Sequence, residues 1–258
     1  MDTIRYEKEG ALGIVTLTNP PMNLIDMEMV DGISDAVERA ENDGLRGLLM
    51  KNDEAHFCVG ADVKLFLGLS PKEADPIFRQ FLGVINRVEK LPFPTMAAVN
   101  GMCLAGGLEI ALAFDLIWAG QTAMFGQAEA MIGAIPVGGG AQRLAARAGT
   151  TRTKEIVFGA RLYPAADFEK WNIINRVLPD AEVVEKAKKY MGALANNGAT
   201  RALAAVKEIL AEFSEETVRE ADEKTLKLSA RMFETEDLRA GVDSFLKEGP
   251  GKAKFSGK

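Results

Sequence analysis

Two glutamates stand alone in apolar, glycine-rich stretches of the sequence. Glu109 is the only charged residue in the range 104–113, and Glu129 stands in a second such stretch. A carboxylate is rarely buried fully without a partner or a function, and burial raises its pKa towards the range that general acid–base catalysis uses. The pair therefore predicts two carboxylates that face one cleft. The alternative is that each glutamate is a structural polar group or points to solvent.

The side chains on which other catalytic sites depend are scarce. The chain has a single histidine, His56, which excludes a histidine-rich metal site, and it has neither a Gly-x-Ser-x-Gly motif nor a Gly-x4-Gly-Lys phosphate loop. The two cysteines, Cys58 and Cys103, lack the spacing of metal ligands and stand in apolar runs, so we expect unreactive, partly buried thiols. The chemistry must come from carboxylates and from the backbone, and we expect no metal.

Composition describes a chain that can bury a substantial core. Its 258 residues are 47% hydrophobic, enough for one large domain or for a main domain with a smaller one. The net charge of −6 argues against a nucleic-acid partner, which normally requires a basic face. The apolar stretch around Glu109 is interrupted by Asp115 and is too short to span a membrane. The opening residues lack the pattern of a secretion signal, and we expect a cytoplasmic protein.

Four segments with the pattern of strands must position the glutamates. Residues 13–18 alternate with a period of two, and residues 45–50, 95–99 and 116–119 are short apolar runs typical of buried strands. Helical patterns separate them. Strands that alternate with helices indicate crossover connections and parallel pairing, so the sequence predicts an α/β body.

Two amphipathic helices are expected between these strands. Asp26 can cap the first, whose apolar residues recur at helical spacing at Val30, Ile33, Val37 and Ala40. The second lies between 70 and 90, and the sequence offers two starting points. Ser70 and Glu73 have the spacing of a capping box, while Asp75 precedes a proline at the first helical position.

Beyond about residue 150 the strand patterns fade and helical periods dominate. Apolar residues recur at helical spacing in the ranges 183–194 and 203–213, in a third run around 218–226, and in a fourth that ends near Phe245. We therefore predict a body over residues 1–195 followed by a helical carboxy-terminal region over residues 196–258.

Three glycine-bearing junctions between strands and helices lie at 56–63, 100–109 and 135–144. Small residues let a ligand approach the backbone, and the first N–H groups of a helix have no internal partner. Two such helix starts aimed at one point would form an oxyanion hole. The alternative is that the glycines serve only tight turns and close packing.

Together, four ordered segments carry a family resemblance. They are Phe57-Cys58-Val59-Gly60-Ala61-Asp62-Val63, Asn100-Gly101 through Gly106-Gly107-Leu108-Glu109, Phe125-Gly126-Gln127-Ala128-Glu129, and Ile135-Pro136 through Gln142-Arg143-Leu144. By these segments the chain resembles the enoyl-CoA hydratase/isomerase (crotonase) family over essentially its whole length. The resemblance implies a spiral of repeated ββα units and a helical carboxy-terminal region that drives assembly into homotrimers, which often pair into hexamers.

The resemblance also implies roles for individual residues. Glu109 and Glu129 match the two catalytic carboxylates, and the backbone N–H groups of Ala61 and Gly106 match the pair that holds the thioester oxygen. The positions that match contacts to coenzyme A are Val59, Ala61, Val63 and, in a looser alignment, Phe245. Leu65 and Phe66 are candidates for the acyl pocket, although a helix packed on the core would have the same pattern.

The implied activity is the reversible hydration of 2-trans-enoyl-CoA, with no cofactor other than the CoA of the substrate. An isomerase that moves the double bond needs only one carboxylate, so the presence of both favours a hydratase. A member that binds acyl-CoA or RNA without catalysis is a further alternative. The chain departs from the family at Met22, where a basic CoA contact is common, and at Ala105 and Ala128, where glycine and proline are common.

Overall fold

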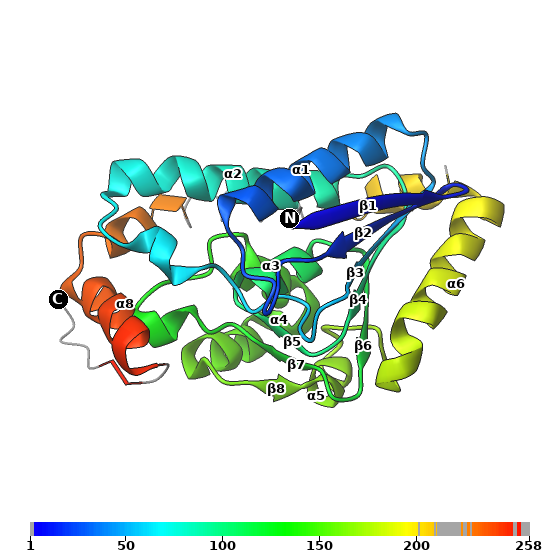
Figure 1. Cartoon of the computed structure of the whole chain (residues 1–258). Coiled ribbons are helices and arrows are strands. Elements are labelled where there is room, and N and C mark those ends of the chain that lie inside the picture. Colours follow the sequence, from blue (N-terminus) through cyan, green and yellow to red (C-terminus); the bar gives the residue numbers. More distant parts are fainter. Residues whose placement is uncertain are drawn as a thin grey trace.

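The large sheet of the protein has six strands, most of them parallel (Figure 1). The computed structural model describes residues 3–200, 202–208, 210, 223, 226–227, 229–249 and 252–253. In spatial order the strands are β1 (Ile4–Glu9), β2 (Leu12–Leu17), β3 (Gly47–Asn52), β4 (Thr95–Val99), β6 (Leu116–Gly120) and β9 (Arg176–Leu178). Only β1 runs antiparallel to its neighbour among these described pairs. The four strands expected from the sequence are confirmed, with β3 displaced by two residues from the expected range.

A second, smaller sheet follows the ends of the parallel strands. It consists of β5 (Met102–Leu104), β7 (Met124–Gly126) and β8 (Tyr163–Pro164), with β5 parallel to β7. A single parallel bridge between Cys58 and Cys103 extends this sheet towards the chain that leaves β3. The turns of the chain that contain β3, β4 and β6 thus each contribute one strand to the large sheet and a short strand or bridge to the small one.

Helices complete the repeating units. The α-helices are α1 (Met27–Asn42), α2 (Pro71–Glu89), α3 (Gly106–Leu112), α4 (Gly140–Gly159), α5 (Ala165–Lys170), α6 (Val183–Asn197) and α8 (Glu236–Glu248), and the 3-10 turns are η1 (Val63–Phe66), η2 (Glu129–Ile132) and η3 (Asp180–Glu182). The order β1-β2-α1, then β4-β5-α3, then β6-β7-α4 agrees with the spiral of ββα units that the family resemblance implied.

The helix starts follow local chemistry. The Asp26 side chain accepts a hydrogen bond from Met29 N at 2.8 Å, which confirms the expected cap of α1. The start of α2 is at Ser70, whose backbone N donates to Glu73 at 2.8 Å, and Pro76 lies inside the helix. Asp75 pairs with Arg79 one turn later instead of capping.

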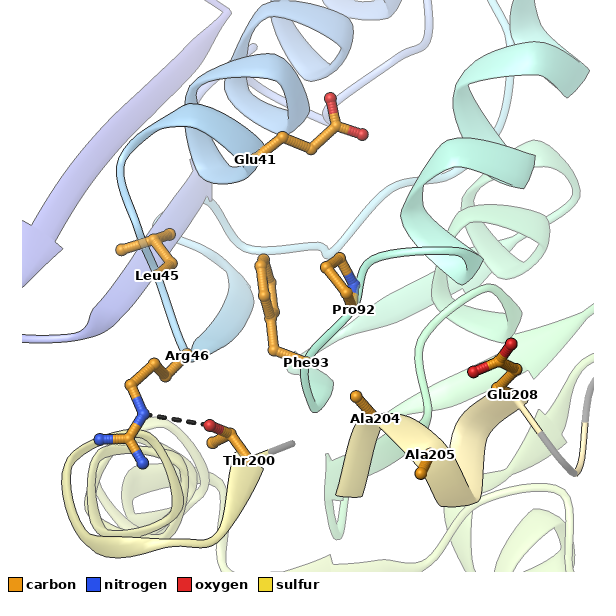
Figure 2. A pocket seen from close by; sticks show the side chains of 9 residues that line it. All are labelled: Glu41, Leu45, Arg46, Pro92, Phe93, Thr200, Ala204, Ala205 and Glu208. Carbon is orange, nitrogen blue, oxygen red and sulfur yellow. Dashed lines mark hydrogen bonds between the residues drawn. The ribbon is translucent and has the colours of Figure 1, made fainter. Parts of the chain in front are cut away.

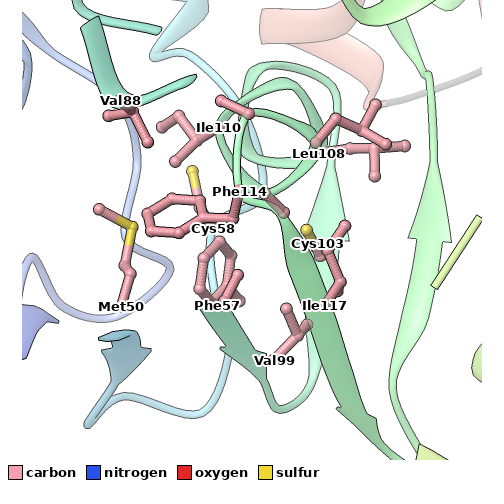
Figure 3. Packing of buried hydrophobic residues seen from close by; sticks show 14 of the residues in the cluster. Met50, Phe57, Cys58, Val88, Val99, Cys103, Leu108, Ile110, Phe114 and Ile117 are labelled. Atoms are coloured by element: carbon pink, nitrogen blue, oxygen red, sulfur yellow. The ribbon is translucent and has the colours of Figure 1, made fainter. Parts of the chain in front are cut away.

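Two apolar clusters pack against opposite faces of the large sheet. One joins the sheet to α1, α2 and α3, and the other joins it to α6, so the sheet is covered on both sides (Figure 1). Parallel sheets need this double cover because their strands are apolar on both faces. Figure 3 shows Cys58 and Cys103 among the side chains of the first cluster, and both thiols are fully buried and free. Burial raises the pKa of each thiol, in keeping with the expected lack of reactivity.

The third apolar cluster connects α8 to the body. Ile132 of η2 packs with Phe78 of α2 and with Leu238 and Val242 of α8. The expected helix at 203–213 is described only over 202–208 and at 210, and most of the 218–226 run lies outside the described residues. The division of the chain at residue 195 stays a prediction.

Candidate active site

Glu109 lies at the centre of α3, where every residue is buried, and its own exposed fraction is 1%. Its Oε1 accepts a hydrogen bond from the backbone N of Gly140, the first residue of α4, at 2.8 Å. Burial raises the pKa of Glu109 to about 7, and the increase is limited by the backbone donors of the 137–140 turn and by the charge of Arg143. This carboxylate can therefore gain or lose a proton near neutral pH.

The turn that contacts Glu109 is built from glycines because no larger residue fits. A Cβ at Gly138 would lie 3.0 Å from Glu109 Oε2, and one at Gly140 would lie 2.9 Å from Oε1 and would overlap the amide of Gln127. Between them Gly139 has a φ of +81°, a conformation that favours glycine. The third glycine junction thus serves as the cradle of a carboxylate, a role that the sequence analysis did not assign to it.

Glu129 occupies a different environment on η2. Its Oε2 is buried and has no hydrogen-bond partner in the described part of the chain. Burial raises the pKa of Glu129 well above its usual value, and the nearby charge of Glu109 raises it further. The charge of Glu109 thus acts on Glu129, and the prediction that the two carboxylates face one cleft stays a prediction.

Gln127 is a polar residue of this site that sequence reasoning did not select. Its side chain is completely buried, and neither amide atom has a hydrogen-bond partner among residues 3–200 or the later described residues. Its Nε2 faces the start of α4, beside Glu109. The signal was present in the segment Phe125–Glu129, where a glutamine stands between apolar neighbours and two positions before a glutamate.

The backbone of Ala61 is oriented by one parallel bridge to Ile25. Ile25 N donates to Gly60 O, and Asp62 N donates to Ile25 O, both at 2.9 Å. In such a bridge the flanking peptide groups pair with Ile25, so the N–H of Ala61 itself points away from it. Among the residues that the structure describes, the Ala61 N–H has no acceptor.

Gly106 opens α3, and its N–H likewise has no acceptor in the described structure. The preceding residue, Ala105, has a φ of +50°, an uncommon conformation for a residue with a side chain. A Cβ at Gly60 would lie 3.0 Å from Ala105 Cβ and 3.9 Å from Gly106 N. The first and second glycine junctions are therefore adjacent, which brings Ala61 and Gly106 together.

A buried asparagine supports this arrangement. Asn23 accepts a hydrogen bond from Asn19 N at 2.7 Å and donates one to His56 O at 2.9 Å, which ties the loop after β2 to the loop after β3. The ring of His56 in turn accepts Met102 N at 3.3 Å. The single histidine thus contributes to the structure of the loops.

The residues matched to CoA and acyl contacts occupy less enclosed positions. Val59, Val63 and Leu65 are half-buried near the first junction. The ring of Phe66 lies 6.0 Å from that of Phe78 and 6.3 Å from that of Phe233, and Phe245 packs against the same third cluster. The structure therefore places Val63, Phe66 and Phe245 on one apolar cluster. Their roles in binding stay predictions.

A separate pocket lies at the amino-terminal ends of β3 and β4, and Figure 2 shows the side chains that line it. It has a volume of about 410 Å³, and its lining includes Leu45 and Arg46 before β3 and Phe93 before β4. The glycine junctions instead follow the ends of β3 and β4. Since these strands are parallel, the pocket lies at their amino-terminal ends and the paired glutamates lie beyond their carboxy-terminal ends. The lining of the pocket includes none of the candidate residues. Arg46 spans part of it to Thr200 at 3.0 Å (Figure 2).

Two other kinds of site can be assessed in the described residues. They contain no group of histidine, cysteine, aspartate or glutamate side chains that could hold a metal ion. Within those same residues, no helix has the length and apolar character needed to cross a membrane.

Comparisons with known proteins all point to one family. The family model described as enoyl-CoA hydratase/isomerase matches residues 7–258. A probable enoyl-CoA hydratase of Rhizobium meliloti (strain 1021) is 30% identical over 247 residues, which cover 95% of each chain. The crystal structure of an enoyl-CoA hydratase/isomerase from Xanthobacter autotrophicus Py2 is 27% identical, with a TM-score of 0.85 over 96% of this chain and 94% of the other. The structure of an enoyl-CoA hydratase from Mycobacterium avium subsp. paratuberculosis K-10, at 23% identity and a TM-score of 0.88 over 98% of both chains, shares the fold.

Proposed function

The chain belongs to the enoyl-CoA hydratase/isomerase family, and we propose that it catalyses the reversible hydration of 2-trans-enoyl-CoA to 3-hydroxyacyl-CoA. The observation that carries this proposal is the pair of buried carboxylates with unlike surroundings. Glu109 has a pKa of about 7, whereas that of Glu129 is raised well above its usual value. Two titratable groups whose environments separate their pKa values provide a base and an acid in one site.

In the proposed reaction Glu109 acts as the base and Glu129 as the acid. The ionised carboxylate of Glu109 takes a proton from water, whose oxygen bonds to C3 of the enoyl group. The electrons of the double bond move towards the thioester, and the protonated carboxyl of Glu129 delivers its proton to C2. Dehydration exchanges the two roles.

The charge that develops on the thioester oxygen requires donors. We assign this role to the N–H groups of Ala61 and Gly106, which lie on adjacent junctions and lack acceptors in the described structure. The start of α3 adds the favourable field of a helix terminus. Loss of one donor of this kind typically costs about 3 kcal/mol of transition-state stabilisation.

The substrate supplies the only coenzyme that the proposal requires. Val59, Ala61, Val63 and Phe245 are the proposed contacts to CoA, and Leu65 and Phe66 the proposed contacts to the acyl chain. We further propose a homotrimer, alone or as a dimer of trimers, located in the cytoplasm, with neither nucleic acid nor membrane as a partner.

The decisive experiment follows the ultraviolet absorbance of the conjugated enoyl thioester with crotonyl-CoA and longer 2-enoyl-CoAs. Rapid loss of absorbance with formation of 3-hydroxyacyl-CoA supports the hydratase and ranks the chain lengths. If a 3-enoyl-CoA gains the absorbance while 2-enoyl-CoAs keep it, the protein is an isomerase. Binding of CoA without either change identifies a non-catalytic member of the family.

A further inference from the structure

Arg143 is a buried cation next to the turn that holds Glu109. It lies on the first turn of α4, its exposed fraction is 4%, and its guanidinium is shared among three acceptors. Nη1 donates to Gly138 O at 3.0 Å, and Nη2 donates to Asn86 at 2.8 Å. Nε and Nη2 contact the two oxygens of Glu89 at 3.2 and 2.7 Å.

These contacts connect α2 to the glycine turn. Asn86 and Glu89 belong to the last turn of α2, and Gly138 lies two residues before Gly140, which donates to Glu109. Glycines alone do not define a conformation, because they lose more freedom on folding than other residues. A planar, bidentate guanidinium supplies the missing constraint by fixing the carbonyl at one end of the turn against a rigid helix.

We propose that Arg143 is a positioning residue of the active site, which holds the Gly138–Gly140 turn against α2 and thereby fixes the backbone donor of Glu109. Glu89 and Asn86 act with it, since they orient the guanidinium. This inference rests on the proposed function only for its kinetic consequences, because the contact between the turn and Glu109 exists whatever the reaction is.

The charges around Glu109 make the inference measurable. Arg143 of α4 lowers the pKa of Glu109 against the effect of burial, and Glu129 of η2 is the coupled acid. The strand β5, which also packs on α3, has only Met102, Cys103 and Leu104 and adds no carboxylate or cation. Glu89 is half-exposed and compensates part of the charge of Arg143. Removing either partner of this ion pair should therefore shift the titration of Glu109, in opposite directions.

The experiment compares Arg143→Gln, Arg143→Lys and Glu89→Gln by two readouts: the pH profile of kcat/KM with crotonyl-CoA, and the titration of the Glu109 carboxyl by ¹³C NMR, assigned with Glu109→Gln. Arg143→Gln should raise the midpoint by about one pH unit and lower kcat at neutral pH more than it changes KM. Glu89→Gln should lower the midpoint. Arg143→Lys keeps the charge, so the midpoint should stay near that of the wild type, while kcat falls because an ammonium cannot hold three acceptors in one plane.

Arg147 provides the matched control. It is a second arginine on the same helix, one turn later, and it donates to Ile173 O at 2.9 Å and to Phe114 O at 2.7 Å, away from the glycine turn. Arg147→Lys should reduce thermal stability and leave the titration midpoint of Glu109 in place, but, unlike Arg143→Lys, it should keep kcat near that of the wild type.

Equal midpoints in Arg143→Gln, Glu89→Gln and the wild type, or shifts in one direction for both variants, would overturn the inference. If Arg143→Gln does not fold, the test is the midpoint of Glu109 in Glu89→Gln, which should be lower than in the wild type. The side chain of Glu89 is partly exposed, so this substitution should have little effect on packing. The NMR titration separates this inference from the proposed function. Opposite shifts in a protein that hydrates no enoyl-CoA would retain the role of Arg143 and reject the hydratase.

Discussion

The two regions that carry Glu109 and Glu129 are built by different means, although the carboxylates interact with each other. Glu109 lies on α3, and the backbone N of Gly140 at the start of α4 donates a hydrogen bond to its carboxylate. Glu129 lies on the single turn η2, which α8 covers through apolar contacts around Ile132. One glutamate is fixed by hydrogen bonds and the other by packing.

The difference explains why different groups shift the pKa values of two identical side chains. Donors that contact a carboxylate favour its charged form, whereas apolar packing without donors favours the neutral form. Both glutamates are desolvated, so it is the Gly140 N–H and the Arg143 charge that separate them. In the proposed mechanism, local backbone geometry, rather than residue type, would decide which glutamate is the acid and which is the base.

Replacing either glutamate tests this assignment most strongly. Glu129→Gln mimics the protonated carboxyl, so the protein should fold with an unchanged Tm, while hydration slows by roughly 10³-fold because no proton can reach C2. Glu109→Gln should keep the bond from Gly140 N and lose a similar factor, because an amide cannot accept a proton from water. Rates are measured with crotonyl-CoA. Near-wild-type hydration in Glu129→Gln would remove it from the mechanism.

The glycine turn contacts Glu109 and not Glu129, so a substitution in this turn should act through Glu109. In Gly140→Ala the new Cβ meets Glu109 Oε1 at 2.9 Å and overlaps Gln127, so the carboxylate must move. A misplacement of this size should lower kcat roughly 10²-fold. Gly83→Ala is the control, since Gly83 lies in α2 with open space around it, and it should stabilise the protein by about 0.5–1 kcal/mol without changing kcat. If Gly140→Ala and Gly83→Ala have equal kcat values, the glycine turn does not set the position of the Glu109 carboxylate.

The packing of α8 should affect Glu129 to a smaller extent. A Cβ at Gly241 would overlap the carbonyl oxygen of Ile132, so Gly241→Ala must displace α8 from η2. Overpacking of this kind costs about 1–3 kcal/mol, and kcat should fall while the NMR titration of Glu109 changes little. Ala240→Ser, on the exposed face of α8, should leave both unchanged. A normal kcat in a destabilised Gly241→Ala would show that η2 holds its conformation without α8.

The smallest expected effect is on stability as a function of pH. The pKa of Glu109 is raised from 4.5 to about 7 in the folded protein, so the folded state binds more protons than the unfolded state between these values. The contribution of Glu109 to stability is therefore greatest below pH 4.5 and decreases as pH rises to about 7. Chemical denaturation at several pH values should show a flatter profile for Glu109→Gln than for the wild type. Identical profiles would indicate that Glu109 is not desolvated.

Much of the fold followed from the sequence because its main signals are local. The alternation in β2, the apolar runs of β3, β4 and β6 and the Asp26 cap each appear within a few residues. The small sheet did not, because strands of two or three residues and the single Cys58–Cys103 bridge carry no period. The start of α2 could not be decided either, since the sequence has two capping signals five residues apart, of which the capping box of Ser70 and Glu73 is the one that forms.

The site was predictable in its carboxylates and less so in their partners. An isolated glutamate in an apolar run is visible in the sequence, and the resemblance added Ala61 and Gly106. The hydrogen bond from Gly140 to Glu109 joins two residues that are far apart in the sequence, and the one from Arg143 to Gly138 depends on how the glycine turn folds. No local sequence pattern predicts either contact. Gln127 was overlooked because a lone glutamine has no characteristic spacing.

Because of the parallel bridge at Ile25, two neighbouring amides should exchange with deuterium at very different rates. The Asp62 N–H, bonded to Ile25 O at 2.9 Å, should exchange slowly, while the Ala61 N–H, which has no acceptor in the described structure, should exchange quickly. A thioester oxygen bound at Ala61 should slow the exchange of that amide but not of the Asp62 amide, which serves as the internal reference. This pair of adjacent amides can therefore report occupancy of the site without a chromophore and without turnover.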